Sequence, residues 1–186
     1  MEQNVIKKSM WNAAGTAGLA LGAVSSFYLF AGQFIAGNLE SASLWQQVIA
    51  IALWIIKFAG CICLMYFFMK KFADENAGAD VKTVYKMGTA TAFLSALMFS
   101  AIYLANMLYI SADFYNQIYQ MILQQVEPTL DSNSMSALGK IIDRLPQITF
   151  FYNLTYCFVY GTVLASILSR SIFSKRAASE NIPDEQ

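Results

Sequence analysis

Four long apolar stretches constrain this chain more than any other feature of its sequence. They cover residues 12–36, 46–69, 88–111 and 147–169, and the only charged side chain within them is Lys57. The hydrocarbon core of a bilayer is about 30 Å thick, and roughly 20 helical residues span it. A water-soluble helix of such length carries a stripe of charged residues, which these stretches lack. The sequence therefore predicts an all-α fold, an integral membrane four-helix bundle.

The lysines and arginines outside the spans predict the orientation of the bundle, because cytoplasmic loops carry an excess of them. The loop after the third span holds Lys140 and Arg144, and the loop after the first holds none. Both termini are therefore expected on the cytoplasmic side. The basic residues that predict this side are Lys7, Lys8, Lys70, Lys71, Lys82, Lys86, Arg170, Lys175 and Arg176.

Residues 113–146 predict an extracytoplasmic helical hairpin between the third and fourth spans. Apolar residues alternate with glutamines at helical spacing up to Pro128, which is expected to end an amphipathic helix. Asp131 or Ser132 can serve as the N-cap of a second helix, and Pro146 suits the first turn of the fourth span. This insertion either caps the bundle or docks an extracytoplasmic partner.

One transmembrane domain is expected over residues 1–176, followed by a disordered cytoplasmic tail over 177–186. The pair Lys7 and Lys8 before an apolar run is also typical of a secretory signal peptide. Here the apolar run continues beyond the roughly 7–15 residues of a signal-peptide core, without a clear small-x-small cleavage site. We therefore expect the first span to be retained.

Small residues recur at three- and four-residue intervals in the first and third spans. Gly15, Gly18 and Gly22 share one face of the first span, and Ala92 and Ala96 share one face of the third. In lipid, small residues let helix backbones approach closely, so these residues predict helix packing. Contacts within the chain, self-association and contact with a membrane partner all remain open.

Lys57 is the least expected residue, because it lies near the middle of its span. A lysine at this depth costs roughly 2.5–3.5 kcal/mol on insertion scales, and such residues often mark function. None of the four spans contains Asp or Glu, so the ammonium must find hydroxyls, carbonyls, water or an external anion, or lose its proton. The candidate intramembrane polar site comprises Lys57, Tyr103, Asn106 and Tyr156. The lysine is either neutral or held by hydroxyls, or it faces an anionic ligand.

Composition removes several classes of function. The chain has no His, and its 12 basic residues balance 12 acidic ones, so neither a histidine-based catalytic site nor nucleic-acid binding is expected. Cys61 and Cys63 point to nearly opposite helix faces, and Cys157 lies in another span, so they predict no metal site. No paired carboxylates or nucleotide-binding glycine loop are present. We expect no catalytic residue, cofactor or metal.

The order of features resembles the bacterial family called Domain of Unknown Function 4199. The resemblance rests on Trp11-Asn12 before a glycine-rich span, on "DVKTVYKMGTATAFLSALMFSAIYL", on an insertion ending near Pro146, and on "SILSRSIFSKR". It implies a small four-helix inner-membrane protein of the kind found mainly in Bacteroidota, and no activity. It also implies a link to glycosyltransferases of the polyprenyl-phosphate-sugar type. The chain has "SADFYN" where the family pattern has a "DP" turn, which puts a shared role of the outer loop in doubt.

Two functions remain open after these arguments. The first is a non-enzymatic accessory or scaffold subunit for a membrane partner, such as a polyprenyl-phosphate glycosyltransferase in envelope glycan assembly. The alternative is a small transporter or lipid-handling protein in which Lys57 attracts an anionic headgroup. The expected partners are membrane lipids and either a membrane protein or further copies of the chain.

Overall fold

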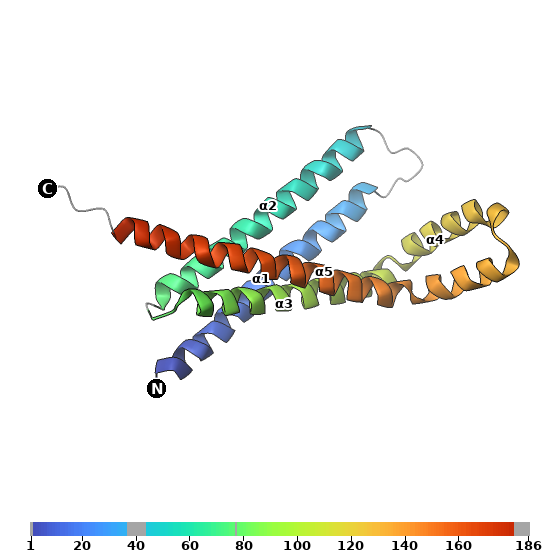
Figure 1. Cartoon of the computed structure of the whole chain (residues 1–186). Helices are drawn as coiled ribbons and strands as arrows, with labels where there is room; N and C mark the ends of the chain where they lie inside the picture. Colours follow the sequence, from blue (N-terminus) through green and yellow to red (C-terminus); the bar gives the residue numbers. More distant parts are fainter. Residues whose placement is uncertain (1, 37–43, 77, 181–186) are drawn as a thin grey trace.

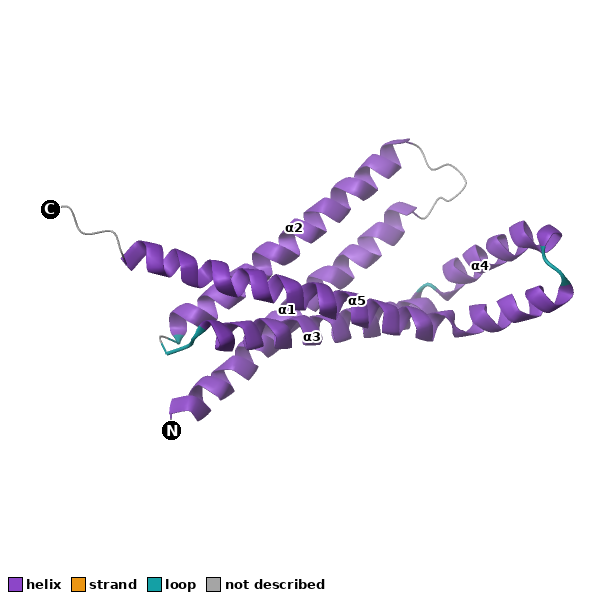
Figure 2. Cartoon of the chain, in the orientation of Figure 1, coloured by secondary structure: helices purple, strands orange, loops and turns teal. Residues whose placement is uncertain are grey.

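The computed structural model describes residues 2–36, 44–76 and 78–180, and every element within them is helical (Figures 1 and 2). Four of the helices are long and apolar enough to cross a membrane. The prediction of an all-α chain with four apolar spans is therefore confirmed, while the membrane side of each end stays a prediction. The elements are α1 (Glu2–Ala36), α2 (Leu44–Glu75), α3 (Val81–Ala105), the π-helix η2 (Asn106–Ile110), α4 (Ala112–Val126), the 3₁₀ turn η3 (Glu127–Thr129) and α5 (Ser132–Glu180).

The expected break before the fourth span is wrong. The second helix of the hairpin and the fourth span form one helix, α5, which continues through Pro146. A proline removes one backbone hydrogen bond, but long membrane helices tolerate it because neighbouring groups compensate for the bond. The expected tail at 177–186 also needs correction, since α5 extends to Glu180. Residues 181–186 lie outside the described part of the chain.

The best-packed part of the molecule is the end that holds the start of α1, the turn from α2 to α3 and the last part of α5, here called the termini end. Its core contains Ala14, Met69, Phe72, Val84 and Met87, all at most 2% exposed. The opposite end, where α1 ends and α4 follows η2, is called the hairpin end. In Figure 1 the hairpin-end halves of α1 and α2 diverge from α3 and α5.

Small residues bring α1 and α3 into close contact. A Cβ added at Gly18 would lie 2.7 Å from the Cβ of Leu94, and one at Gly22 would lie 2.7 Å from Sδ of Met98. At Gly18 only glycine fits without a shift of α3, whereas at Gly22 the flexible side chain of Met98 would have to move. Gly15 needs correction, because an added Cβ there would meet nothing within 4 Å. With about 100° of rotation per residue, Gly15 lies beside the face of α1 that contacts α3, and not within it.

Small residues also bring α3 and α5 together in an antiparallel register. A Cβ at Gly88 would lie 2.8 Å from that of Ala165, and a Cβ at Gly161 would lie 2.5 Å from that of Ala92. Ala96, one turn farther along α3, is 1% exposed. Ala92 and Ala96 are thus buried, as a packing face requires. The sequence analysis did not single out Gly88, which precedes them on α3, or Gly161, which faces Ala92 from α5. Gly88 and Ala92 have the same four-residue spacing as Gly161 and Ala165, which is the signal that could have found them.

The hairpin consists of α4, η3 and the first part of α5, and no residue of α4 is buried. The predicted amphipathic helix therefore exists, and Pro128 lies in the 3₁₀ turn that ends it. The carboxylate of Asp131 accepts a hydrogen bond from the backbone N–H of Ser134 at 3.2 Å, as an N-cap does. Hydrogen bonds from Ser134 lower the pKa of Asp131.

Candidate functional site

Lys57 lies on α2 and reaches toward α3. Its Nζ lies 4.8 Å from the centroid of the Phe99 ring, within the range of a cation–π contact. Phe99 is 8% exposed, so the ring offers its face from inside the bundle. The lysine itself is partly buried. The ammonium therefore lies inside the bundle and not along the outer surface of α2.

Lys57 lines a cavity of about 150 Å³ that α1, α2, α3 and α5 enclose together, here called the central cavity. Tyr156 and Tyr160 of α5 contribute phenol rings, and Ser25 of α1 contributes a hydroxyl. No described residue of its lining carries a carboxylate. The described residues that line it are Leu21, Ser25, Trp54, Lys57, Phe58, Cys61, Met65, Ala92, Ser95, Ala96, Phe99, Tyr156, Cys157, Tyr160, Gly161 and Leu164.

A second cavity of about 260 Å³ lies toward the hairpin end, between α1, α2 and α3, and is here called the hairpin-end cavity. Trp54, Lys57 and Phe99 line both cavities and so lie at their boundary. Tyr103, one turn after Phe99, also lines the second cavity, and its ring centroid lies 5.9 Å from that of Phe99. The remaining lining residues are Tyr28, Leu29, Gly32, Ala50 and Leu53.

The charge of Lys57 is only partly compensated by these surroundings. A central lysine costs roughly 2.5–3.5 kcal/mol, and a cation–π contact returns about 0.5–2 kcal/mol. Among the described residues that line either cavity, none is Asp or Glu. Among the described residues, Lys57 therefore has no acidic partner. The attraction between its ammonium and an anion is stronger in this space than it would be in water.

Tyr156 belongs to a ladder of aromatic rings that lines the boundary between α5 and α2. Its ring is stacked with Tyr152 and Tyr160, at centroid distances of 6.1 and 6.5 Å. Phe58 of α2 meets Tyr160 at 5.0 Å and stacks on Trp54 at 5.4 Å. Trp54 and Tyr156 are 62% and 56% exposed, although both line the central cavity. The cavity thus reaches the outer surface of the bundle between α2 and α5.

Asn106 does not join Lys57 in either cavity. It begins the π-helix η2, is 0% exposed, and accepts a hydrogen bond on Oδ1 from the Ser111 hydroxyl at 3.0 Å. Its Nδ2 donates to the Tyr115 hydroxyl at 3.4 Å, and Gln33 Nε2 donates to the same oxygen at 2.8 Å. These four residues, the hairpin network, tie α1 to η2 and to α4. Single π-turns within helices frequently mark functional sites.

The hairpin network adjoins the hairpin-end cavity through Tyr103. The ring centroids of Tyr103 and Tyr115 lie 6.4 Å apart. Burial raises the pKa of Tyr115 above its ordinary range, and the neighbouring Tyr103 hydroxyl raises it further. Tyr115 is therefore a neutral phenol at physiological pH. The sequence indicated Tyr103 and Asn106, but not Tyr115, whose position depends on the fold of the hairpin back toward α1.

Two of the three cysteines lie in the wall of the central cavity. Cys61 of α2 and Cys157 of α5 both line it, and the sulfur of Cys61 lies 3.7 Å from the hydroxyl oxygen of Ser25. Cys63 is exposed. The expected opposite orientation of Cys61 and Cys63 agrees with these positions. The described residues contain no group of three His, Cys, Asp or Glu side chains that could hold a metal ion.

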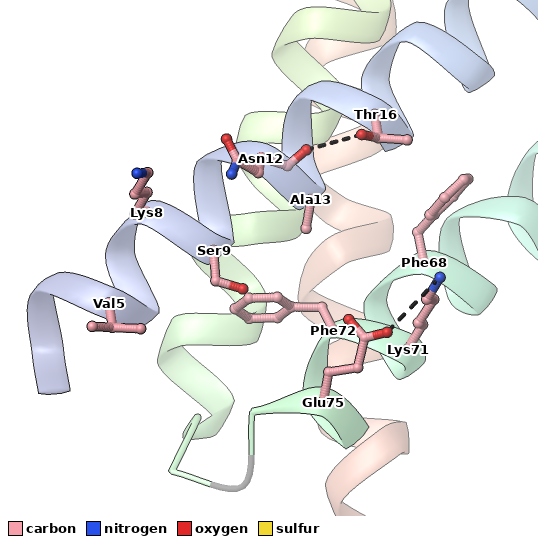
Figure 3. A pocket seen from close by; sticks show the side chains of 10 residues that line it. All are labelled: Val5, Lys8, Ser9, Asn12, Ala13, Thr16, Phe68, Lys71, Phe72 and Glu75. Atoms are coloured by element: carbon pink, nitrogen blue, oxygen red, sulfur yellow. Dashed lines mark hydrogen bonds and ion pairs between the residues drawn. The ribbon is translucent and has the colours of Figure 1, made fainter.

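A third cavity, of about 450 Å³, lies between α1 and α2 at the termini end (Figure 3). Lys71 pairs with Glu75 there at 3.8 Å, and both side chains are more than half exposed, so the pair adds little stability. Lys8, Ser9, Asn12 and Thr16 of α1 form the rest of the polar part of the wall, and Phe72 forms part of the apolar part. Glu75 offsets one of the two lysines, and water screens the exposed charges, so this cavity attracts an anion less strongly than the surroundings of Lys57 do.

A family model described as "Protein of unknown function (DUF4199)" matches residues 16–170. The chain belongs to the DUF4199 family. This confirms the resemblance inferred from the sequence. Comparison with curated proteins and with solved structures found no match.

The DUF4199 segment contains the whole lining of the central and hairpin-end cavities, as well as the hairpin network. The third cavity, shown in Figure 3, lies partly outside the family segment, because Lys8 and Asn12 precede residue 16. The family description assigns no activity, so the functional argument depends on the site itself. Within the family segment, Lys57 is the feature with the most specific chemistry.

Proposed function

We propose that this DUF4199 protein is a non-enzymatic membrane protein that binds the anionic headgroup of a lipid at Lys57. The observation that carries the proposal is the position of its ammonium, at the boundary of two cavities with no carboxylate among the described residues that line them. A phosphate or carboxylate there would supply the missing counter-charge. Tyrosine and serine hydroxyls in the same walls can donate hydrogen bonds to its oxygens.

The lateral opening of the central cavity favours a lipid over a soluble anion, and the size of the cavities limits how much of the lipid can enter. Their volumes, about 150 and 260 Å³, are below the roughly 300–1,000 Å³ of pockets that enclose a complete small ligand. A headgroup fits while its chain stays outside. The exposed rims at Trp54 and Tyr156 connect the central cavity with the bilayer between α2 and α5. An amphiphile can therefore keep its apolar chain in the membrane and place its charge beside Lys57.

Trp54 offers a direct test, because it lines both cavities. The substitutions Trp11→Phe and Trp45→Phe leave Trp54 as the only one of the three tryptophans. We expect acyl-brominated phosphatidylglycerol to quench Trp54 fluorescence more strongly than acyl-brominated phosphatidylcholine at the same mole fraction. The excess quenching should vanish in Lys57→Met and persist in Lys57→Arg, which keeps the charge.

Two controls accompany this measurement. A variant that keeps only Trp45, which is 76% exposed and lines neither cavity, should show no preference between the lipids. Lys86→Met, which removes a charge from the exposed side of α3, should leave the preference at Trp54 intact. Equal quenching by both lipids in the protein with Lys57, or a preference that survives Lys57→Met, would contradict the proposal.

A second proposal, that the protein is an accessory subunit of a membrane enzyme, has its support in α2. This helix leaves many large apolar side chains uncovered, among them Ile51, Ile55 and Phe67. A partner helix could cover them as well as lipid can. A polyprenyl-phosphate glycosyltransferase that co-purifies in mild detergent at fixed stoichiometry would support this role. Recovery of the chain alone or as a homo-oligomer would count against it.

The proposed location is a bacterial inner membrane, with both termini in the cytoplasm. The distribution of lysines and arginines supports this orientation. Single cysteines introduced at residues 73–80 and 130–140, in a chain without its native cysteines, test it with an impermeant thiol reagent. Cysteines in the first range should react only from the cytoplasmic side, and those in the second only from the outer side.

A further inference from the structure

We infer that the Lys57 site, besides its lateral opening between α2 and α5, opens toward the hairpin end of the bundle and is closed toward the termini end, so that it forms a blind pocket along the bundle axis. The inference rests on the proposed function and specifies where its ligand comes from. The lipid is drawn from the leaflet at the hairpin end, and its headgroup does not pass through the bundle to the other side. The protein in this conformation holds a lipid and does not carry it across.

The closed side is the packed core of the termini end, and the third cavity between α1 and α2 at this end shares no lining residue with the central cavity. The central cavity ends there at Leu21, Met65 and Leu164. Beyond it lie Met69 and Val84, both 0% exposed. A Cβ at Gly88 would already lie 2.9 Å from the terminal methyl carbon of Met69, so this layer has no space for even one added carbon. Because interiors of this kind are packed to crystal-like density, a hydrated or lipid-linked anion cannot cross it without the helices separating.

The open side is built from residues close to the ends of α1 and α2. Gly32 and Ala50 line the hairpin-end cavity, one turn before the end of α1 and about two turns after the start of α2. A Cβ at Gly32 would meet nothing within 4 Å. The cavity occupies about 260 Å³ between α1, α2 and α3 at this end. Polar groups continue outward from Tyr103 to the hairpin network.

Glycines with open space around them allow a test with matched substitutions. Gly32→Cys introduces a thiol into the hairpin-end cavity, and Gly60→Cys introduces one on the exposed face of α2, outside both cavities. Gly139→Cys marks the hairpin itself. An added Cβ meets nothing within 4 Å at any of the three positions, so folding should be preserved. Each is made in a chain whose three native cysteines are replaced by alanine.

The three variants are placed in sealed vesicles of both orientations and treated with an impermeant, anionic methanethiosulfonate reagent. Gly139→Cys, reconstituted in the same way, shows for each preparation how much of the protein has its hairpin side toward the reagent. With the hairpin side toward the reagent we expect Gly32→Cys to react about tenfold faster, or more, than in the opposite orientation, and faster than Gly60→Cys in either. Lys57→Met should slow the reaction of Gly32→Cys with the anionic reagent and leave its reaction with a cationic one unchanged or faster.

The possible outcomes separate this inference from the proposed function. Equal reaction of Gly32→Cys from both sides, or reaction no faster than Gly60→Cys, would overturn the blind pocket. The lipid preference at Trp54 could survive either result. Loss of that preference together with one-sided reaction at Gly32→Cys would instead overturn lipid binding and leave the blind pocket in place.

Discussion

Gly161 is where the contact between α3 and α5 leaves least room, and Gly161→Ala is the sharpest test of the fold. An added Cβ would lie 2.5 Å from the Cβ of Ala92 and 3.4 Å from its Cα, whereas ordinary contact begins at 3.4 Å. Neither atom of Ala92 can rotate away, because one is backbone and the other is bonded directly to it. The two helices would have to separate by roughly 1 Å, which disturbs the packing along the whole interface.

Two opposing effects determine how much Gly161→Ala changes the free energy of unfolding. Overpacking of this kind costs about 1–3 kcal/mol, and alanine in place of glycine within a helix returns about 0.8–1 kcal/mol. With the added carbon so close to an immovable neighbour, we expect a net loss of about 1–2 kcal/mol. Gly60→Ala is the matched control, because an added Cβ there meets nothing within 4 Å and keeps only the gain in helix propensity.

Unfolding in mixed micelles with increasing dodecyl sulfate, followed by circular dichroism, measures these differences. Gly161→Ala should unfold at a lower detergent fraction than the unchanged protein, and Gly60→Ala at an equal or higher one. Combining Gly161→Ala with Ala92→Gly moves the methyl group to the other side of the same contact, and should recover most of the loss. If Gly161→Ala proves as stable as Gly60→Ala, the register between α3 and α5 described here is incorrect.

Three further predictions concern the caps and the polar groups. The hydroxyl and backbone N–H of Thr83 donate hydrogen bonds to the carboxylate of Asp80 and lower its pKa. The stability that Asp80 contributes as the N-cap of α3 should therefore be lost as pH falls through that lowered pKa. Asp80→Ala should cost about 1 kcal/mol at pH 7, and Asp80→Asn should remove the pH dependence at little cost, both measured by unfolding in mixed micelles. Tyr115→Phe removes the acceptor for two amide donors, and should increase hydrogen exchange in α4, measured by mass spectrometry. Phe99→Leu removes the ring beside Lys57 and should reduce the lipid preference at Trp54 without abolishing it.

The sequence was sufficient to predict the four helices that are long and apolar enough to cross a membrane, since apolar length is a local property. It also singled out Lys57, because one charge among so many apolar residues is visible without a structure. The continuation of α5 through Pro146 could not be predicted in this way. A proline before an apolar run suits the first turn of a new helix and the interior of a long one equally well, and tertiary packing decides between them.

The pairing of helix faces was harder to predict than the helices themselves. Gly15 shares the spacing of Gly18 and Gly22, yet only the latter two face α3 closely. Cys61 and Cys157 are far apart in the sequence and meet at one cavity only because of the register between α2 and α5. The spacing of small residues shows which face of a helix allows close approach, but not which other helix packs against that face.

The most direct test of the central claim is the lipid that the purified protein retains. Native mass spectrometry from membranes of known composition reports bound lipids by mass. The protein with Lys57, and the control Lys86→Met, should each retain an anionic lipid in preference to a zwitterionic one, and Lys57→Met should lose that preference. Retention of the same anionic lipid by Lys57→Met, or no anionic preference in the unchanged protein, would contradict the assignment of this lysine as a headgroup site.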